Sequence, residues 1–534
     1  MGLYFSKIII IYYEIIVMVK SVSGYVRSFN TGDVFLINIM GFSLGLALCS
    51  NPSFIGSNGP SASIGVVIVL GTLLAVCNGL LYGWFSAVYP SAGGDYIFIS
   101  RTFGKYAKIS GIGFLASLGF TVCQIYGLSS NLQLIPEMAL TPCFESLGLH
   151  FEMPQIVSQY LPSVFCFVYF IIVIINPSIN QLFKRVFLWM FFICGLLGPI
   201  IMIYSFYNTS TEDFIRVYNV YMNDPEAYNN VISAIARNND NVLFDTFNAL
   251  PLGFLCFMGF TYSVYSGSEI KNPKRSQVLG IMLALILGFI TFFFGMSAYV
   301  DMVGQEFHAN IGQISGFAFS LQTAASLVIE NHFLNILMNI GITVWWIAVP
   351  YVMFQVCIHN FVAWSVDNIL PGKFLHRWNG VHIYCALLVL VISEIILCLA
   401  ISSNDSIYLT NAVALASITF LLVGWSAIRL KPNSKIYKRL PEFAKKDFLW
   451  LVPGLSWFTG FGYVCLLAFA CFVAKALLYP EGGSMYSAIF WTIGIYLIGF
   501  ICYRCRFKYL QKKNEIEIDG FEEDFYEIPD DLYE

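Results

Sequence analysis

The chain has 534 residues, of which 58% are hydrophobic and only 11% are charged. Soluble globular domains carry about 25% charged residues, so this composition excludes a large soluble domain and predicts a protein that lies in membrane lipid. The formal net charge of −4 indicates no particular partner, and the absence of a basic, aromatic-rich patch argues against nucleic-acid binding.

Apolar segments recur along nearly the whole chain. A membrane-spanning helix needs about 20 mostly apolar residues. We therefore expect an all-α integral membrane protein with about twelve transmembrane helices. In chain order these spans are 34–57, 62–89, 109–135, 162–180, 186–206, 246–268, 277–300, 333–360, 382–403, 407–428, 450–475 and 484–503.

The predicted spans occupy a membrane domain at 31–505, between an N-terminal segment at 1–30 and an acidic tail at 506–534. An apolar run from Ile8 to Val19 is short, which allows an interfacial helix or a signal-like segment. We favour translated upstream sequence, with Met18 as the true start. After Lys513 the chain has many acids but no Lys or Arg, which is typical of a solvated tail.

Lys and Arg collect on one side of the predicted spans. With a cytoplasmic N-terminus, every Lys and Arg falls on the inner side except Arg216, Arg237 and Lys475. Because positive charge collects on cytoplasmic loops, we expect a multi-pass protein of the cell membrane with both termini in the cytoplasm. The 14 cysteines lie mostly in apolar runs, which indicates packing and not a disulfide framework.

Signatures of an enzyme or an ATP-driven pump are absent from the sequence. It contains no GxxxxGK[ST] phosphate loop, no HExxH motif and no paired CxxC metal site. The predicted spans carry no chain of Asp, Glu and His of the kind that conducts protons in pumps. We therefore expect no catalytic residue, no cofactor and no bound metal.

Glycines interrupt the first and sixth spans near mid-membrane. Span 1 contains Gly41 and Gly45, and span 6 contains Gly253 and Gly259. Paired broken spans in two halves of a membrane protein indicate a transporter's binding site, because non-helical backbone is tolerated there only in protein or beside a cavity. Close helix packing on small residues is the alternative. The offset of five spans, which forces opposite orientations, favours a binding site.

Four segments resemble motifs of the amino acid–polyamine–organocation superfamily of permeases, in an order and spacing that agree over residues 31–503. The most specific are Y-P-S-A-G-G-D-Y at 89–96, followed by S-R-T-F-G at 100–104, and F-M-G-F at 257–260, followed by E-I-K-N-P-K-R at 269–275. The others are N-I-M-G at 38–41 and D-N-I-L-P at 367–371.

The resemblance implies the leucine-transporter fold, in which helices 1–5 and 6–10 form inverted repeats, helices 1 and 6 are broken at mid-membrane, and two helices follow. The repeats would occupy about 31–206 and 246–428, and the last two helices about 450–503. It also implies a secondary active transporter of amino acids that works by alternating access. Two residues depart from the family pattern: Phe42 in the first break, and Thr261 where many members have Glu.

An amino acid in a membrane needs one partner for its carboxylate and another for its ammonium group. At a helix break, free N–H groups can bind the anion and free carbonyls the cation. We predict the carboxylate site at the N–H groups of residues 42–45 with the Ser43 hydroxyl, and the ammonium site at the carbonyls of Ile39 and Cys256. The complete predicted substrate site is Ile39, Met40, Gly41, Phe42, Ser43, Leu44, Gly45, Tyr126, Cys256, Phe257, Met258, Gly259 and Phe260.

Spans 1, 3, 6 and 8 contain no Asp or Glu, which favours a neutral or apolar amino acid as substrate. The alternatives are a transporter of a polyamine, another organic amine or a nucleobase on the same fold, and a non-transporting membrane sensor.

Residues 347–357 of span 8 include no Ser or Thr that would bind sodium, so we expect H+ coupling or exchange. Arg101 is expected either to pair with Glu269 or Asp367 as an inward gate or to be a solvated loop charge.

Overall fold

The structure is a computed structural model that describes residues 27–149, 154–174, 177–234, 241–315, 319–377, 381–400, 407–429, 437–438, 440, 442–468 and 483–513. Most of the N-terminal segment, including Met18, and most of the acidic tail lie outside the described residues. Within these ranges the regular elements are all helices, and two isolated β-bridges are the only strand-like pairings.

The first repeat of five spans begins with a broken helix. Its spans are α2 (Thr31–Phe42) with α3 (Leu44–Asn58), α4 (Ile64–Val88), α6 (Ile112–Leu134) continued by η1 (Ile135–Leu140) and α7 (Thr141–Ser146), α8 (Gln155–Ile174) and α9 (Pro177–Tyr207). The amphipathic loop helix α5 (Asp95–Ser110) lies between the second and third spans.

The second repeat also begins with a broken helix. Its spans are α12 (Val242–Leu255) with α13 (Tyr262–Tyr265), α14 (Pro273–Val303), α17 (His332–Val366), α18 (Ile383–Ala400) and α19 (Ile407–Arg429). The last two spans are α22 (Val452–Cys465) and α24 (Gly483–Lys512). Short connecting elements are α10 (Thr211–Tyr221), α11 (Ala227–Ser233), η2 (Gly267–Glu269), α15 (Gln305–Ser315), α16 (Leu321–Val328), η3 (Gly372–Leu375) and α21 (Glu442–Trp450).

The twelve predicted spans correspond to apolar helices of the structure, which confirms an all-α membrane protein. In the described part of the chain, eight helices are long and apolar enough to cross a membrane, and four shorter apolar helices occupy the remaining predicted positions. Helices α8 and α9 begin at Gln155 and Pro177, before the predicted starts of the fourth and fifth spans at 162 and 186. Proline suits the first turn of a helix.

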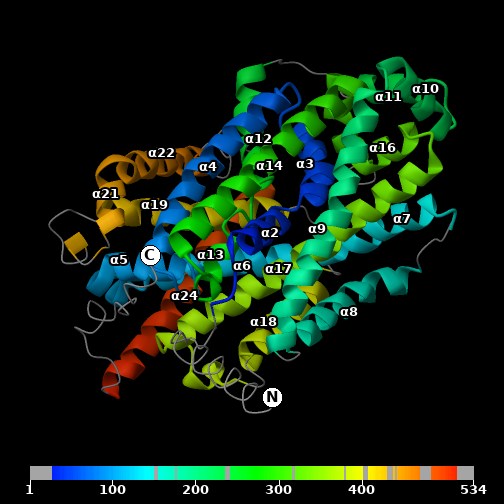
Figure 1. Cartoon of the computed structure of the whole chain (residues 1–534). Helices are drawn as coiled ribbons and strands as arrows, with labels where there is room; N and C mark the ends of the chain where they lie inside the picture. The colour runs from blue at the N-terminus through cyan, green and yellow to red at the C-terminus, as the bar shows by residue number, and fades with distance from the viewer. Residues whose placement is uncertain are drawn as a thin grey trace, which may run out of the picture.

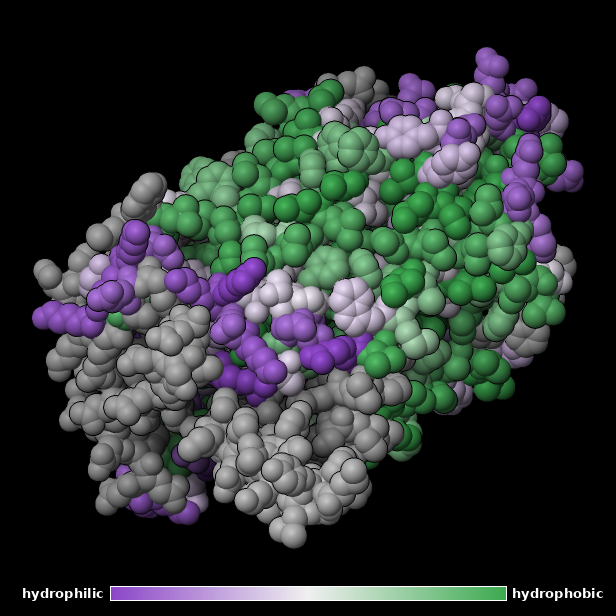
Figure 2. All heavy atoms as spheres, in the orientation of Figure 1, coloured by the Kyte–Doolittle hydropathy of each residue, from purple (hydrophilic) through white to green (hydrophobic). Residues whose placement is uncertain are grey.

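The connecting helices are segregated at two ends of the molecule, as the predicted topology requires. Figure 1 shows α10, α11 and α16 together at one end, whereas α5 and α21 lie toward the other. Figure 2 shows hydrophobic residues over the broad face between the ends and hydrophilic residues where α10 and α11 lie. Exposed Leu, Ile, Phe and Trp side chains on α9, α14 and α24 are consistent with a surface that faces lipid.

The spans pack as two groups. In the first group, α14 packs on α2 and α4, and α12 packs on α3 and α4. In the second, α17 packs on α6 and α9, and α18 packs on α6 and α8. The two broken helices therefore belong to the same group, and both face the long helix α17 of the other group through contacts of α2, α3 and α13.

Candidate functional site

The break in the first span lies at Ser43. Its backbone has φ 51° and ψ 96°, outside the helical region, so that α2 ends at Phe42 and α3 begins at Leu44. Positive φ is uncommon for a residue other than glycine and costs free energy that the surrounding structure must offset. The first span is thus interrupted at the residues where the sequence predicted the break.

The break in the sixth span is longer. Helix α12 ends at Leu255, and α13, which has only four residues, begins at Tyr262. Between them Gly259 has φ +117°, a conformation that L side chains rarely adopt. The segment with Cys256, Phe257, Met258, Gly259 and Phe260 is therefore non-helical, as predicted.

The two breaks touch each other through their backbones. A Cβ placed on Gly259 would lie 2.4 Å from the carbonyl carbon of Gly41 and 2.8 Å from the nitrogen of Phe42. A Cβ on Gly41 would lie 2.7 Å from the Gly259 oxygen and 2.5 Å from the Tyr262 ring. Only glycine permits this approach, so Gly41 and Gly259 join the two interrupted helices at one point.

The backbone hydrogen bonds at Ser43 leave two donors at the start of α3. The Ser43 N–H donates to Ile39 O at 3.0 Å, and the Ser43 hydroxyl accepts from the Leu46 N–H at 3.3 Å. Neither of these two bonds involves the N–H groups of Leu44 and Gly45 in the first turn of α3. The hydroxyl still has its own proton to donate.

The carbonyls predicted for an ammonium group lie at the C-terminal ends of α2 and α12. Ile39 O accepts the Ser43 N–H and keeps a second lone pair, and among the described hydrogen bonds none ends on Cys256 O. The Cys256 thiol is bonded to α3, the second half of the first span, since the Asn51 amide donates to it at 3.1 Å. Cys256 and Asn51 are both buried.

The aromatic residues predicted for the site face different neighbours. Phe42 and Phe257 pack against each other and against Phe292 of α14, within the group of helices that contains both breaks. Phe260 packs against Phe420 of α19. Ile39, Met40 and Leu44 are fully buried, and Met258 and Tyr126 are partly exposed.

Trp345 of α17 fills the space between the first, fifth and eighth spans. A Cβ on Gly45 would lie 2.5 Å from its ring, and one on Gly195 of α9 would lie 2.9 Å from its indole nitrogen. The indole N–H donates to Gly195 O at 2.8 Å. A fully buried indole therefore occupies this junction.

Polar bonds hold the segment after the second break against both groups of helices. Asn38 of α2 accepts the Ser263 N–H at 2.9 Å, and the Tyr262 hydroxyl donates to the Gln124 side chain of α6. All four residues are buried. Asn38 entered the prediction only through the N-I-M-G motif, and Gln124 and Tyr262 were not predicted. The available signal for Gln124 is a polar amide within an apolar span.

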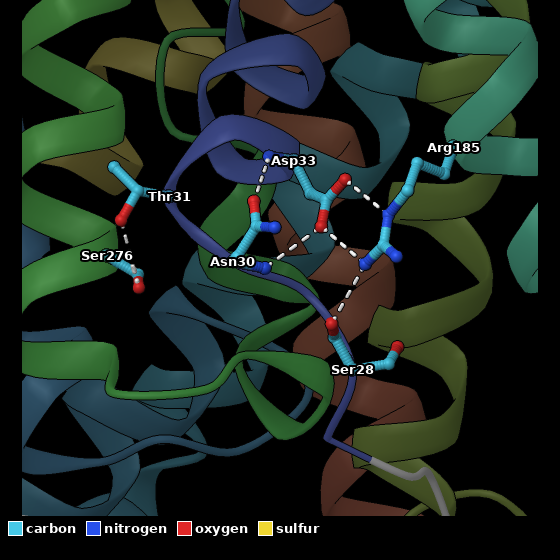
Figure 3. A network of polar contacts seen from close by, with 6 residues as sticks. All are labelled: Ser28, Asn30, Thr31, Asp33, Arg185 and Ser276. Atoms are coloured by element: carbon cyan, nitrogen blue, oxygen red, sulfur yellow. Dashed lines mark hydrogen bonds and ion pairs between the residues drawn. The ribbon is translucent and has the colours of Figure 1, made fainter.

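The start of the first span is bonded to the fifth span, as Figure 3 shows. Arg185 of α9 donates to both carboxylate oxygens of Asp33, at 2.9 and 2.8 Å, and to Ser28 O at 3.0 Å. Asp33 also closes a capping box with Asn30 at the N-terminus of α2. The pair fixes this end of the first span to α9.

The loop helix α5 is bonded to the end of α17. Arg101 forms a bidentate ion pair with Asp367, at 3.0 and 2.9 Å, and the Tyr96 hydroxyl donates to the same carboxylate at 2.5 Å. The sequence left Glu269 and Asp367 open as partners of Arg101, and the structure has Asp367. Asp95 is fully buried on the same helix, and burial raises its pKa to about 7 although a hydrogen bond from the Tyr265 hydroxyl acts to lower it.

Two interrupted helices that meet at mid-span, within an all-helical bundle of apolar spans, define a multi-pass membrane transporter. The sequence profile of the amino acid permease family matches residues 33–501. The chain therefore belongs to this family, within the amino acid–polyamine–organocation superfamily.

One curated relative has a more limited similarity. The uncharacterized protein 399 of Sulfolobus islandicus rod-shaped virus 1 is 33% identical to this chain over 91 residues. The matched segment is 17% of this chain and spans only 23% of the viral protein. This likeness extends over too little of either protein to add to the family assignment.

Proposed function

We propose that the protein transports a neutral, apolar amino acid across a cell membrane by alternating access. The observation that supports this most is the contact between the two breaks at Gly41 and Gly259. It brings the N-terminus of α3 and the C-terminus of α12 to one place, where an amide end and a carbonyl end suit the two charges of an amino acid.

The N–H groups of Leu44 and Gly45, with the Ser43 hydroxyl, are the proposed partners of the substrate carboxylate. The carbonyls of Ile39 and Cys256 are the proposed partners of its ammonium group. Met40, Gly41, Phe42, Phe257, Met258, Gly259, Phe260 and Tyr126 complete the proposed site. Among these, Met258 and Tyr126 are the partly exposed side chains and hence the better candidates for substrate contact.

A charged substrate side chain would lack a partner in this site. From Val34 to Asn58 and from Thr246 to Ser268 the sequence has no Asp, Glu, Lys or Arg. Burying an unpaired charge costs several kcal/mol, so a polyamine, arginine or glutamate would be disfavoured. We therefore propose leucine, phenylalanine and alanine as the type of cargo.

The junction of the first, fifth and eighth spans offers few oxygen ligands for a sodium ion, which argues against sodium coupling. The Trp345 indole fills that junction, and residues 347–357 include no Ser or Thr. Sodium prefers several oxygen ligands, as other hard cations do. Proton coupling or substrate exchange is the proposed mode of transport.

The test is counterflow in proteoliposomes loaded with unlabelled leucine, with labelled leucine outside and competitors added in turn. We expect competition by phenylalanine and alanine but not by arginine, glutamate or spermidine. Arginine, glutamate or spermidine competing better than phenylalanine would contradict the proposed substrate class. Accumulation that needs a sodium gradient would contradict the proposed coupling.

A further inference from the structure

A carboxyl group and an imidazole face each other at the inner side of the second break. Glu269 ends η2, which follows α13, and His359 lies in α17. The His359 Nε2 atom is 2.8 Å from the Glu269 Oε1 atom, and each side chain is only 2% exposed. The His359 Nδ1 atom is 2.7 Å from the Gln355 carbonyl oxygen.

This geometry requires one proton more than a neutral histidine and a carboxylate carry together. A carbonyl oxygen only accepts, so Nδ1 must hold the proton that bonds to Gln355 O. A neutral imidazole then has a lone pair at Nε2, which would face the acceptor oxygen of Glu269. At 2.8 Å two acceptors repel unless a proton lies between them, so the pair binds a proton in this conformation.

The pair connects the two groups of helices. Glu269 belongs to the group with the breaks, and its backbone oxygen accepts the N–H groups of Ser28 and Phe29, at 2.7 and 2.9 Å, just before α2. His359 lies in α17, which packs on α6 and α9. Alternating access moves one such group against the other. Opening the inner side would therefore separate Glu269 from His359.

The neighbouring titratable and charged groups are mostly engaged elsewhere. Tyr351 of α17 is close enough to interact electrostatically with Glu269. Asp33 of α2 and Asp367, which directly follows α17, pair with Arg185 and Arg101. Further titratable or charged groups are Cys357 of α17, Tyr262 of α13 and Cys123 of α6. Lys271 follows η2, and Arg27, which precedes α2, donates to Ile270 O and Pro90 O.

We propose that Glu269 and His359 form the proton-binding site of this transporter, loaded while the inner side is closed and emptied into the cytoplasm when it opens. The inference rests on the proposed transport function and names its coupling ion. On opening, the N–H or O–H bond of the shared proton breaks, water accepts the proton, and a neutral imidazole and a solvated carboxylate remain. Once the two side chains are separated, no shared hydrogen bond holds the proton between them.

The first test needs no substrate. Cys123 is a buried native thiol of α6 beside Tyr262, so its reaction with a maleimide reports opening of the inner side. The full chain in nanodiscs is labelled between pH 5.5 and 8, and the Cys123 peptide is quantified by mass spectrometry. Loss of one proton on opening makes the open fraction rise by up to tenfold per pH unit.

Two near-isosteric variants remove the proton without removing the bond. In Glu269→Gln the amide donates to the imidazole, and in His359→Gln the amide donates to the carboxylate, so neither pair needs an added proton. We expect Cys123 labelling in both to follow only the intrinsic ionisation of the thiol, and the ratio of wild type to variant to rise with pH. Glu394→Gln, an acid of α18 away from the pair, should keep the wild-type profile.

A second test measures coupling. Proteoliposomes with an acidic exterior should accumulate labelled leucine in the wild type and in Glu394→Gln, but not in Glu269→Gln or His359→Gln. Equal pH profiles of Cys123 in wild type and Glu269→Gln, or acid-driven accumulation by Glu269→Gln, would overturn the inference. Wild-type protein that shows no counterflow of leucine would instead refute the proposed function, while the Cys123 profile still decides whether the pair binds the proton.

Discussion

The backbone of Gly259 lies so close to that of Gly41 that a Cβ on Gly259 would be 2.4 Å from the Gly41 carbonyl carbon. This contact between residues 218 positions apart joins the interrupted first and sixth spans. It makes the two breaks one structural unit, so changes at either glycine are expected to disturb both.

We predict that Gly259→Ala abolishes leucine binding and lowers stability. The added Cβ meets backbone atoms that cannot rotate away, and the φ of +117° disfavours any L side chain. Gly494→Ala is the matched control, because nothing lies within 4 Å of its Cβ position on α24. Scintillation proximity assays should show leucine binding in Gly494→Ala but not in Gly259→Ala, and Gly259→Ala should unfold at a lower temperature. Equal affinity in both variants would contradict the prediction.

Ser43→Leu and Gly45→Leu should abolish substrate binding while the protein still inserts. A bulky side chain at 43 replaces the hydroxyl that caps α3 through the Leu46 N–H. At 45 it meets the Trp345 ring, 2.5 Å from the Cβ position. Binding of labelled leucine, with size-exclusion chromatography as the control for folding, checks this. Normal affinity in both variants would place the site elsewhere.

Arg185→Gln should favour opening of the inner side. The substitution removes two charged hydrogen bonds to Asp33, whose side chain is 5% exposed, and hydrogen bonds to charged groups contribute about 1.5–3 kcal/mol. Arg185→Lys should rescue this only in part, since an ammonium group cannot form the bidentate pair. The measurement is maleimide labelling of Cys123 at fixed pH. Unchanged labelling in Arg185→Gln would show that the Arg185–Asp33 ion pair does not hold the inner side closed.

Stability should depend on pH through Asp95. Burial raises its pKa from 3.8 to about 7, so the folded state binds a proton that the unfolded state releases. This contribution is complete below pH 3.8 and is lost as the pH rises to about 7, with a slope of about 1.4 kcal/mol per pH unit. Asp95→Asn should flatten the fall in unfolding temperature between pH 5 and 7. Asp213→Asn, at an exposed ion pair, should leave that fall unchanged.

The predicted orientation is open to a labelling test. Val220 of α10 is 75% exposed, and Lys446 of α21 is exposed on the end predicted to be cytoplasmic. Single cysteines at 220 and 446 should react with an impermeant maleimide from opposite sides of sealed vesicles. Labelling from the same side would contradict the twelve-span topology and the opposite orientation of the repeats.

The amino-acid sequence was sufficient to predict the helical fold, the number of spans and the positions of both breaks. These features follow from local chemistry: runs of about 20 apolar residues form spanning helices, and Gly41 and Gly259 weaken the helix at fixed places in the chain. Ser43 and the stretch from Cys256 to Phe260 are non-helical where the glycines predicted it. Helices α8 and α9 begin several residues before the predicted spans, because hydropathy does not detect the polar first turns of a helix.

The pairs of side chains that lie in contact could not be predicted from the sequence and follow from the arrangement of the helices in space. The Ser43 N–H, one of the predicted carboxylate donors, is already bonded to Ile39 O, and the Trp345 indole fills a junction that hydropathy cannot describe. Glu269 and His359 are 90 residues apart in the chain and form a buried pair because α13, which directly precedes η2, packs on α17. Hydropathy reports how much of each helix is apolar, but the rotation of one helix against another sets which polar atoms face each other, and that depends on packing across the whole bundle.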